Sequence, residues 1–319
     1  MAEDGMAEET RESAGKGGAE PFLLVFGLGY CGEAILRAFQ SQGGQGVGTH
    51  RAATGEAGRI AFAEAGEWIP RASHVLITAP PSAEGDPVLG RFAAALRTAP
   101  RLRWIGYLSS TGVYGDWGGA WVDETTPPRP ASPRAVARLA AEEAWRAFGE
   151  SHAVDIFRLG GIYGPGRSVF AALRAGTARR VIKPGQFFSR IHRDDITAAV
   201  LAAMANAPAR GVRLFNLVDD LPAPPEAVIE EAARLLGLPP PPALPFEEAR
   251  TTMSPMALSF WLDNRRVDNR RTKAALGLSW RYPTYREGLA AVLRAESGEE
   301  SLIEQGKESA AEKSEIFRA

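Results

Sequence analysis

The chain has 319 residues, of which 45% are hydrophobic, so it can bury a sizeable core and is not disordered throughout. Its 37 Lys and Arg residues balance 38 Asp and Glu residues, and this neutral charge argues against a nucleic-acid-binding protein. The single cysteine, Cys31, excludes an internal disulfide framework and a multi-cysteine zinc site, and no apolar run is long enough to cross a membrane.

The two ends of the chain differ in composition from its middle. Residues 1–20 are rich in Gly, Ala and Glu without an apolar block, which predicts a disordered leader and not a secretory signal peptide. Residues 296–319 carry seven Glu and three basic residues, which predicts a charged tail. We therefore expect a folded body from about residue 21 to about residue 295, in a cytoplasmic protein.

Apolar strands alternate with amphipathic helices in the first half of the chain. The apolar runs predict strands at 22–26, 46–50, 74–78, 102–109 and 154–158, and helical spacing predicts helices at 33–40, 87–98 and 132–148. Short continuous apolar runs are typical of strands buried on both faces of a parallel sheet. The pattern predicts an α/β fold, a Rossmann-type doubly wound parallel sheet with helices on both faces.

The second half is less regular, with prolines clustered at 222–225 and 239–245. Patterns there predict helices at 228–236 and 288–294 and a strand at 213–218. We expect the sheet domain to span 21–165 with a return segment at about 190–218. The remaining segments of 166–295 are expected to form a smaller C-terminal lobe that binds substrate.

A glycine-rich turn, Gly27-Leu28-Gly29-Tyr30-Cys31-Gly32, fits the G-x-G-x-x-G pattern between a predicted strand and a predicted helix. In that context the first glycine permits a tight turn, the second lets the backbone approach a diphosphate, and the third lets helix and strand pack closely. The turn therefore predicts a dinucleotide site at residues 27–32. The alternative is a glycine-rich turn without a ligand. Cys31 is either a small packing residue or a thiol activated by the helix start.

The end of the second predicted strand bears on the choice of cofactor. NAD-selective sites usually place an acid there, whereas this chain has Thr49-His50-Arg51 and no acid before Glu56. A guanidinium at Arg51 would bind the 2′-phosphate of NADP. NADP is therefore favoured, with NAD as the alternative, unless Arg51 is only a surface arginine.

Further segments, beyond the glycine turn, resemble the extended short-chain dehydrogenase/reductase superfamily, the group of NAD-dependent epimerases and dehydratases. Residues 108–115 (LSSTGVYG) resemble its S-S-x-x-V-Y-G segment, and residues 157–165 (FRLGGIYGP) its R-x-x-x-x-Y-G-P segment. Residues 191–195 (IHRDD) resemble its I-H-x-x-D segment, and residues 215–219 (FNLVD) its return strand. The resemblance implies cofactor contacts from Ala79, Pro80, Ser109, Arg138 and Gly161.

The catalytic signature of that superfamily, Tyr-x-x-x-Lys, falls on the predicted helix at 132–148. Matching residues 130–142 (PASPRAVARLAAE) to the family pattern places Arg134 at the tyrosine and Arg138 at the lysine. Arginine stays protonated in proteins, so Arg134 cannot exchange a proton near neutral pH. Arg138 could still donate hydrogen bonds to a ribose. The chain is thus similar to atypical members of the superfamily.

Three residues are candidates to replace the missing acid. Ser110 stands where the family keeps a hydroxyl that touches the substrate oxygen, although it could equally cap a strand end. Tyr114 could supply a proton if a nearby cation lowered its pKa, and His192 has an ordinary pKa suited to proton transfer. Both could instead be structural. No spacing of His, Asp or Glu suggests a metal.

The arginines near the family segments would form a clamp for an anionic substrate if two or more converge, and otherwise lie in solvent. They are Arg158, Arg167, Arg190 and Arg193. The sequence thus predicts an NADP-dependent oxidoreductase acting on a small or sugar-like carbonyl compound. A non-catalytic NADP(H) sensor or partner subunit is the second hypothesis, and a sugar-nucleotide epimerase the third. We expect a small-molecule substrate, no nucleic acid or membrane partner, and a monomer or homodimer.

Overall fold

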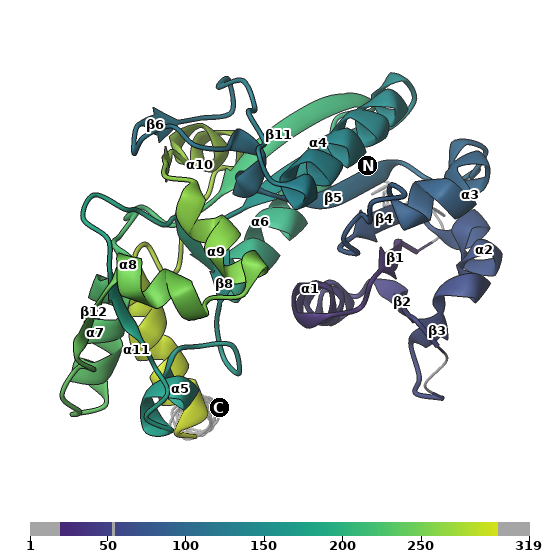
Figure 1. Ribbon diagram of the computed structural model, residues 1–319. Helices are drawn as coiled ribbons and strands as arrows, with labels where there is room; N and C mark the ends of the chain where they lie inside the picture. The colour runs from purple at the N-terminus through teal and green to yellow at the C-terminus, as the bar shows by residue number, and fades with distance from the viewer. Residues whose placement is uncertain (1–19, 53–54, 299–319) are drawn as a thin grey trace, which may run out of the picture.

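The computed structural model of the protein describes residues 20–52 and 55–298. The predicted leader, apart from Glu20, and the predicted charged tail from residue 299 onward lie outside the described residues. Figure 1 shows a sheet flanked by helices, and a second group of helices beside it that contains α5, α7, α8 and α11. Within the described ranges, no helix combines the length and the apolar character needed to span a membrane.

The centre of the fold is a seven-stranded sheet in which every neighbouring pair of strands is parallel, in the order β11-β7-β5-β4-β1-β2-β3. This is the doubly wound order, which reverses direction beside β1, and it confirms the predicted Rossmann-type sheet. All five side chains of β1 are buried, as expected for a strand covered on both faces. The strands are β1 Phe22–Phe26, β2 Gln45–His50, β3 Arg59–Ala61, β4 His74–Ile77, β5 Trp104–Ser110, β7 Ala153–Leu159 and β11 Gly211–Leu217.

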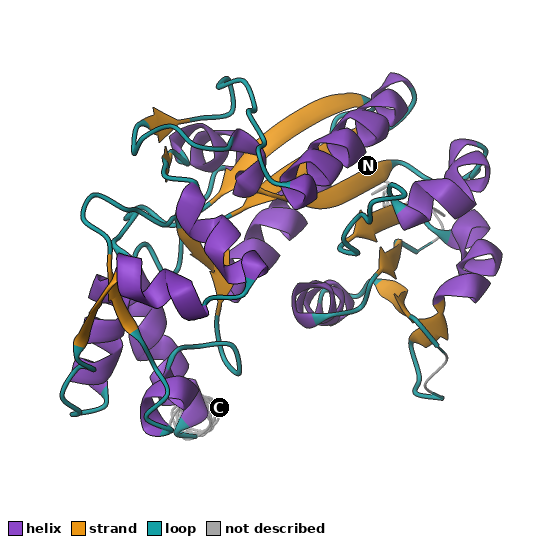
Figure 2. Ribbon diagram, in the orientation of Figure 1, coloured by secondary structure: helices purple, strands orange, loops and turns teal. Residues whose placement is uncertain are grey.

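Helices cover both faces of the sheet (Figure 2). One face packs against α1 (Tyr30–Ser41), α6 (Arg193–Ala205) and α10 (Arg270–Leu276). The other packs against α2 (Ala65–Trp68), α3 (Pro87–Arg97) and α4 (Pro133–Arg146). The predicted helices at 33–40, 87–98 and 132–148 correspond to α1, α3 and α4, whereas α6 was not among the predicted helices.

A smaller group of elements packs beside the sheet around Phe170, Ala232 and Leu289. It contains α5 (Phe170–Arg174), α7 (Pro225–Leu235) and α11 (Tyr285–Glu296). Helices α8 (Phe246–Ala249) and α9 (Pro255–Leu262) pack around a separate cluster that includes Val181 and Phe246. The predicted helices at 228–236 and 288–294 correspond to α7 and α11.

Three short parallel pairs join distant parts of the chain. They are β8 (Gly161–Tyr163) with β10 (Arg190–His192), β9 (Arg180–Ile182) with β12 (Ala243–Pro245), and β6 (Trp121–Val122) with β13 (Arg266–Val267). In the first of these pairs, β8 follows directly after β7 in the chain. The pair therefore connects the end of the sheet to the smaller group of helices.

Candidate active site

The glycine turn between β1 and α1 leaves open space beside Gly29. A β-carbon on Gly27, whose φ is +91°, would lie 2.9 Å from the Ala79 nitrogen, and one on Gly32 would lie 3.0 Å from the Gly27 oxygen. A β-carbon on Gly29 would meet no atom within 4 Å. The fold therefore needs the first and third glycines, while the second borders free space at the start of α1, where helix N–H groups lack helical partners.

Thr49 and Thr78 fasten this turn to the neighbouring strands. The Gly27 nitrogen donates to Thr49 Oγ1 at 2.9 Å, and the Leu28 nitrogen donates to the Thr49 carbonyl at 2.8 Å. The Thr78 hydroxyl donates to the Gly27 carbonyl. The backbone around Gly29 is therefore held in place, which suits a diphosphate-binding loop.

A cleft of about 870 Å³ runs from this turn past the carboxyl ends of β1, β2, β4 and β5. Its charged side chains are Arg51, Arg134, Arg138 and Arg167, and the described residues that line it include no Asp or Glu. Every residue predicted to contact the cofactor lines the cleft except Gly32, which faces β1 and Gly27. The cleft is therefore shaped and charged for an anionic ligand that extends across the switch point of the sheet.

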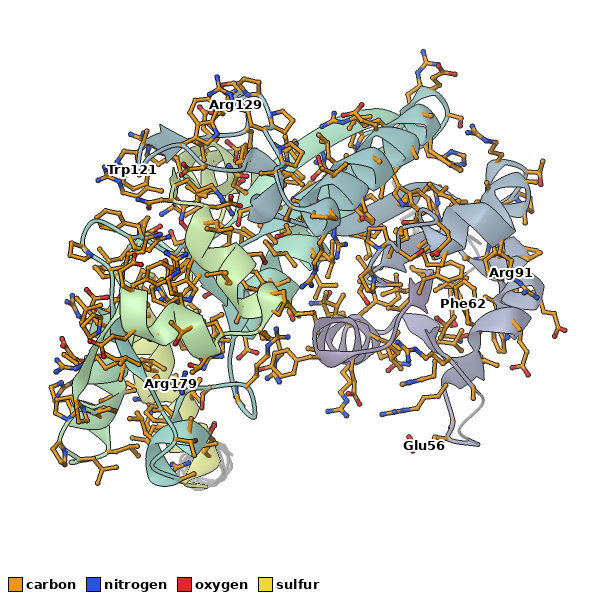
Figure 3. All side chains as sticks on the ribbon, in the orientation of Figure 1. Glu56, Phe62, Arg91, Trp121, Arg129 and Arg179 are labelled. Atoms are coloured by element: carbon orange, nitrogen blue, oxygen red, sulfur yellow. The ribbon has the colours of Figure 1, made fainter. Side chains whose placement is uncertain are left out.

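The nearest acid after β2 in the sequence, Glu56, does not line the cleft. Glu56 sits at the tip of the loop that follows β2 (Figure 3), and its carboxylate pairs with Arg59 Nε at 2.8 Å. Arg51 itself is exposed at the end of the cleft where β2 finishes. This end therefore presents a cation without a neighbouring carboxylate among the described lining residues.

Tyr30 joins the cleft to the loop after β8. Its hydroxyl donates to the Pro165 carbonyl at 2.9 Å, and the Arg167 guanidinium lies 5.7 Å from the centre of its ring. Cys31 is buried beside it, and burial raises the pKa of its thiol to about 11. The thiol therefore stays protonated near neutral pH, which favours the packing interpretation of Cys31.

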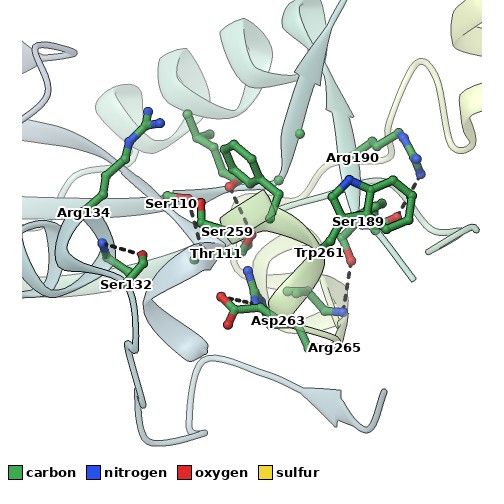
Figure 4. A pocket seen from close by; sticks show the side chains of 18 of the residues that line it. Ser110, Thr111, Ser132, Arg134, Ser189, Arg190, Ser259, Trp261, Asp263 and Arg265 are labelled. Carbon is green, nitrogen blue, oxygen red and sulfur yellow. Dashed lines mark hydrogen bonds and ion pairs between the residues drawn. The ribbon is translucent and has the colours of Figure 1, made fainter. Parts of the chain in front are cut away.

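A second pocket, of about 450 Å³, opens from the end of this cleft (Figure 4). The two share Ser110, Arg134, Arg138, Leu159, Gly160, Gly161 and Phe260. The far wall comes from residues 187–190 and from α9 with the segment after it. A molecule in the second pocket would therefore meet one in the cleft at Ser110.

Arg134 and Arg138 both stand at this junction, in the first two turns of α4. Arg138 Nη1 donates to the Leu108 carbonyl at 2.8 Å and to the Tyr107 hydroxyl at 3.1 Å, which anchors one side of its guanidinium on β5. Arg134 is exposed, and no hydrogen bond or ion pair joins it to another residue of the described chain. Figure 4 shows its side chain extended at one end of the pocket.

The two serines at the end of β5 differ in their surroundings. Ser110 Oγ accepts a hydrogen bond from the Gly112 nitrogen at 3.1 Å, which leaves its hydroxyl proton able to point into the junction. Ser109 is buried and donates to Glu142, whose carboxylate also holds Arg158 with a contact of 2.7 Å. Ser110 is thus the hydroxyl of the two that can meet a substrate.

The other two candidates for a replacement acid, Tyr114 and His192, line neither pocket. Tyr114 is fully buried and donates to Asn216 Oδ1 at 2.8 Å, and burial raises the pKa of its phenol. His192 Nδ1 accepts from the Asp194 nitrogen at the start of α6, and burial lowers the pKa of the ring to about 4. In this structure both side chains therefore serve packing and capping and are not brought to Ser110.

The four arginines considered for an anion clamp do not converge. Arg158 is buried against Glu142, and Arg193 pairs with Asp194 at 3.1 Å. Arg167 lines the cleft, whereas Arg190 lines the second pocket with its Nη1 bound to the Phe188 and Ala223 carbonyls. Arg167 and Arg193 both lie over the Tyr30 ring, at 5.7 and 5.0 Å, but Arg193 pairs with Asp194 and lines neither cavity. The condition for a clamp, two or more of these guanidiniums in one cavity, is therefore not met.

Sequence reasoning missed the contribution of α9 to the site. Phe260 and Trp261 line the second pocket, and Arg265 follows with Nη1 at 3.2 Å from Asp263. The available signal was the run Phe260-Trp261-Leu262 in a proline-bounded segment, because exposed large apolar side chains often border a ligand site.

Comparison with known proteins places the chain in a family. The model of the NAD dependent epimerase/dehydratase family matches residues 91–217. A solved structure of a functionally unknown conserved protein from Silicibacter pomeroyi DSS is 42% identical, with a TM-score of 0.80, and the match covers 87% of this chain and 99% of that one. The chain belongs to the NAD-dependent epimerase/dehydratase family.

Two further relatives match less of the chain or match it at lower identity. A 3-diazoavenalumate denitrifying reductase from a Streptomyces species is 32% identical over 183 residues, 53% of this chain, and the chain spans about half the length (55%) of that relative. The human epimerase family protein SDR39U1, solved with NADPH, matches at 20% identity and a TM-score of 0.71 over 85% of this chain and 98% of that one. At that identity the likeness concerns the fold alone.

Proposed function

We propose that the protein is an NADP(H)-dependent oxidoreductase of the epimerase/dehydratase family that acts on a small carbonyl compound. The observation that carries the proposal is the cleft at the carboxyl end of the sheet, with free space at Gly29 and only arginines as charged side chains among its described lining residues. The diphosphate of a dinucleotide would lie at the start of α1, held by backbone N–H groups. Arg51 and Arg167 would balance its negative charge.

NADP is favoured over NAD because Arg51 lies where the adenosine ribose would be held. A 2′-phosphate adds negative charge at that position, and a guanidinium binds phosphate with two parallel hydrogen bonds. Neighbours of the same fold were solved with NADPH or with NAD, so the choice rests on Arg51. The nicotinamide end would reach Ser110 and Gly161, and when bound this group supplies or accepts a hydride.

The substrate oxygen would be held by the Ser110 hydroxyl. Arg134 and Arg138 keep their protons near neutral pH, so they stabilise negative charge but do not donate the proton that a carbonyl reduction consumes. Because both cavities open to solvent, the proton would come from water. We therefore expect slow turnover that depends on Ser110.

A second candidate is an NADP(H)-binding protein without turnover, acting as a sensor or partner subunit. Two permanently charged arginines at the junction favour it, since neither can replace a general acid. A cytoplasmic location and a monomeric or homodimeric state remain predictions of the sequence.

Calorimetric titration of the purified chain with NADPH and NADH tests the proposal. We expect NADPH to bind at least ~10-fold more tightly than NADH, which corresponds to ~1.4 kcal/mol. Arg51→Ala should remove most of this difference, and Arg91→Ala, an exposed arginine on α3, should leave it unchanged. Turnover of NADPH with a panel of aldehydes and ketones then separates the two candidates. The absence of binding to either coenzyme would refute both.

A further inference from the structure

We propose that the second pocket binds an aromatic or conjugated carboxylic acid, with the carboxylate on Arg134 and the planar group among the aromatic side chains opposite. The proposal rests on the proposed function in one respect: the acid would be the substrate that meets the coenzyme at Ser110. Its evidence is Arg134, unpaired among the described residues at the mouth of the pocket, and the aromatic side chains that line the pocket.

The charge at the junction has no counterion among the described residues. Arg134 forms no ion pair there, and Asp263, the one carboxylate among the described lining residues, is taken by Arg265 at 3.2 Å. Arg138 uses Nη1 for Leu108 and Tyr107, and the rest of its guanidinium forms no hydrogen bond to the described residues. A bound carboxylate would supply the missing negative charge.

The place of Arg134 in its helix strengthens this argument. The first turn of α4 contains no acid, and Ser132 caps it by accepting from the Ala135 nitrogen at 3.2 Å. A cation in the first turn is unfavourable because the helix dipole is positive there. Arg134 and the helix start therefore add their positive potentials at the mouth of the pocket, and an anion relieves both.

Aromatic side chains line much of the pocket. Phe187, Phe188 and Trp261 lie beyond the cleft together with Arg190 and Arg265, and Phe260 lies at the junction that the pocket shares with the cleft. Figure 4 shows Trp261 and Arg190 at the end away from Arg134. The Trp261 ring meets Phe188 edge-on at 5.4 Å and stacks on Phe246 at 5.3 Å, which fixes its orientation. Phe260 is 56% exposed, and no residue of the apolar helix α9 is buried. A planar apolar group in the pocket would cover this exposed surface.

The hydroxyl side chains of the pocket are only partly used by the backbone. Thr111 and Ser259 donate to the Leu159 and Met256 carbonyls, whereas Ser110, Ser132 and Ser189 accept from the Gly112, Ala135 and Val267 nitrogens and keep their own protons free. The described lining contains no Asn, Gln, His, Lys or Glu. A sugar ring needs several side-chain partners for its hydroxyls, whereas a planar acid needs one cation and apolar walls.

Calorimetry on the full chain, with and without saturating NADP⁺, tests the proposal with four probes: trans-cinnamate, its neutral amide, phenyl phosphate and D-glucuronate. We expect cinnamate to bind at least ~10-fold more tightly than each of the others. Arg134→Met should weaken cinnamate binding at least ~10-fold, with Arg91→Met as the control. Phe260→Ala should weaken it, whereas Met256→Ala, also exposed on α9 but outside the pocket, should not.

The outcomes separate this proposal from the proposed function. If NADP⁺ binds and no aromatic acid binds in either condition, the substrate assignment is overturned and the cofactor assignment stands. If NADP⁺ does not bind, Arg134-dependent binding of cinnamate still supports the pocket assignment while the proposed function fails. The assignment to an aromatic carboxylate is overturned if phenyl phosphate or D-glucuronate binds more tightly than cinnamate, or if the neutral amide binds as tightly as cinnamate.

Discussion

Replacing Gly29 with alanine separates the role of the glycine turn in folding from its role in binding. Gly29 has φ −101° and ψ −161°, an extended conformation that alanine adopts, and its added methyl would meet no atom within 4 Å. Alanine reduces the freedom of the unfolded chain, which stabilises by ~0.4–1 kcal/mol, but it is a poorer N-cap than glycine. The free energy of unfolding should therefore change by less than ~1 kcal/mol.

If the proposed function is right, the same methyl would occupy space that the diphosphate needs at the start of α1. We expect G29A to lower NADPH affinity at least ~10-fold, or ~1.4 kcal/mol, measured by calorimetry beside thermal unfolding without ligand. Gly27→Ala is the matched control for folding. Its φ of +91° costs ~1–2 kcal/mol for a residue with a β-carbon, and the contact with Ala79 adds to this cost. NADPH binding by G29A at wild-type affinity would refute the assignment of this loop.

Two further predictions concern buried charges. Glu142→Gln should destabilise the fold by ~3–5 kcal/mol, because it leaves Arg158 buried without a counterion. Glu247→Gln, in an exposed pair, should change the free energy of unfolding by less than ~1 kcal/mol. Equal losses of the two variants in urea unfolding would contradict the stabilising role of the buried pair. Burial lowers the pKa of His74 from 6.5 to about 4, so between these pH values the unfolded chain binds a proton at His74 that the folded state does not bind. His74 should therefore cost no stability above pH 6.5, and the free energy of unfolding should fall as the pH drops from 6.5 toward 4. His74→Phe should make the fall between pH 7 and pH 5 smaller by ~2 kcal/mol. If the variant lost stability with pH in the same way as the wild-type protein, a group other than His74 would be responsible for the loss.

Strands β1 and β4 at the centre of the sheet were predictable because each is a short apolar run. Phe22–Phe26 and His74–Ile77 stand out from their neighbours and end in turn residues, and the helices between them have one apolar face. Helix α6 escaped prediction because it is covered on more than one side. Its buried residues include Asp195 beside Ile196 and Ala199, so it lacks the simple apolar stripe of a surface helix.

The lining of the cleft was predictable where a local motif or a family segment marks the residue. The glycine turn is such a motif. The roles of Arg158 and His192 were not predictable, because each depends on a partner far along the chain or on burial. Arg158 meets Glu142 from another element, and His192 packs 4.1 Å from the ring of Tyr282. The wall formed by α9 likewise depends on contacts with distant residues, since Trp261 packs against Phe188 and Phe246.

The most direct test of the account is a crystal structure of the full chain with NADP⁺. The account predicts the diphosphate at the start of α1 beside Gly29, the adenosine 2′-phosphate near Arg51, and the nicotinamide ring at the junction beside Ser110. A coenzyme bound elsewhere, or bound in this cleft with its diphosphate away from the glycine turn, would contradict it.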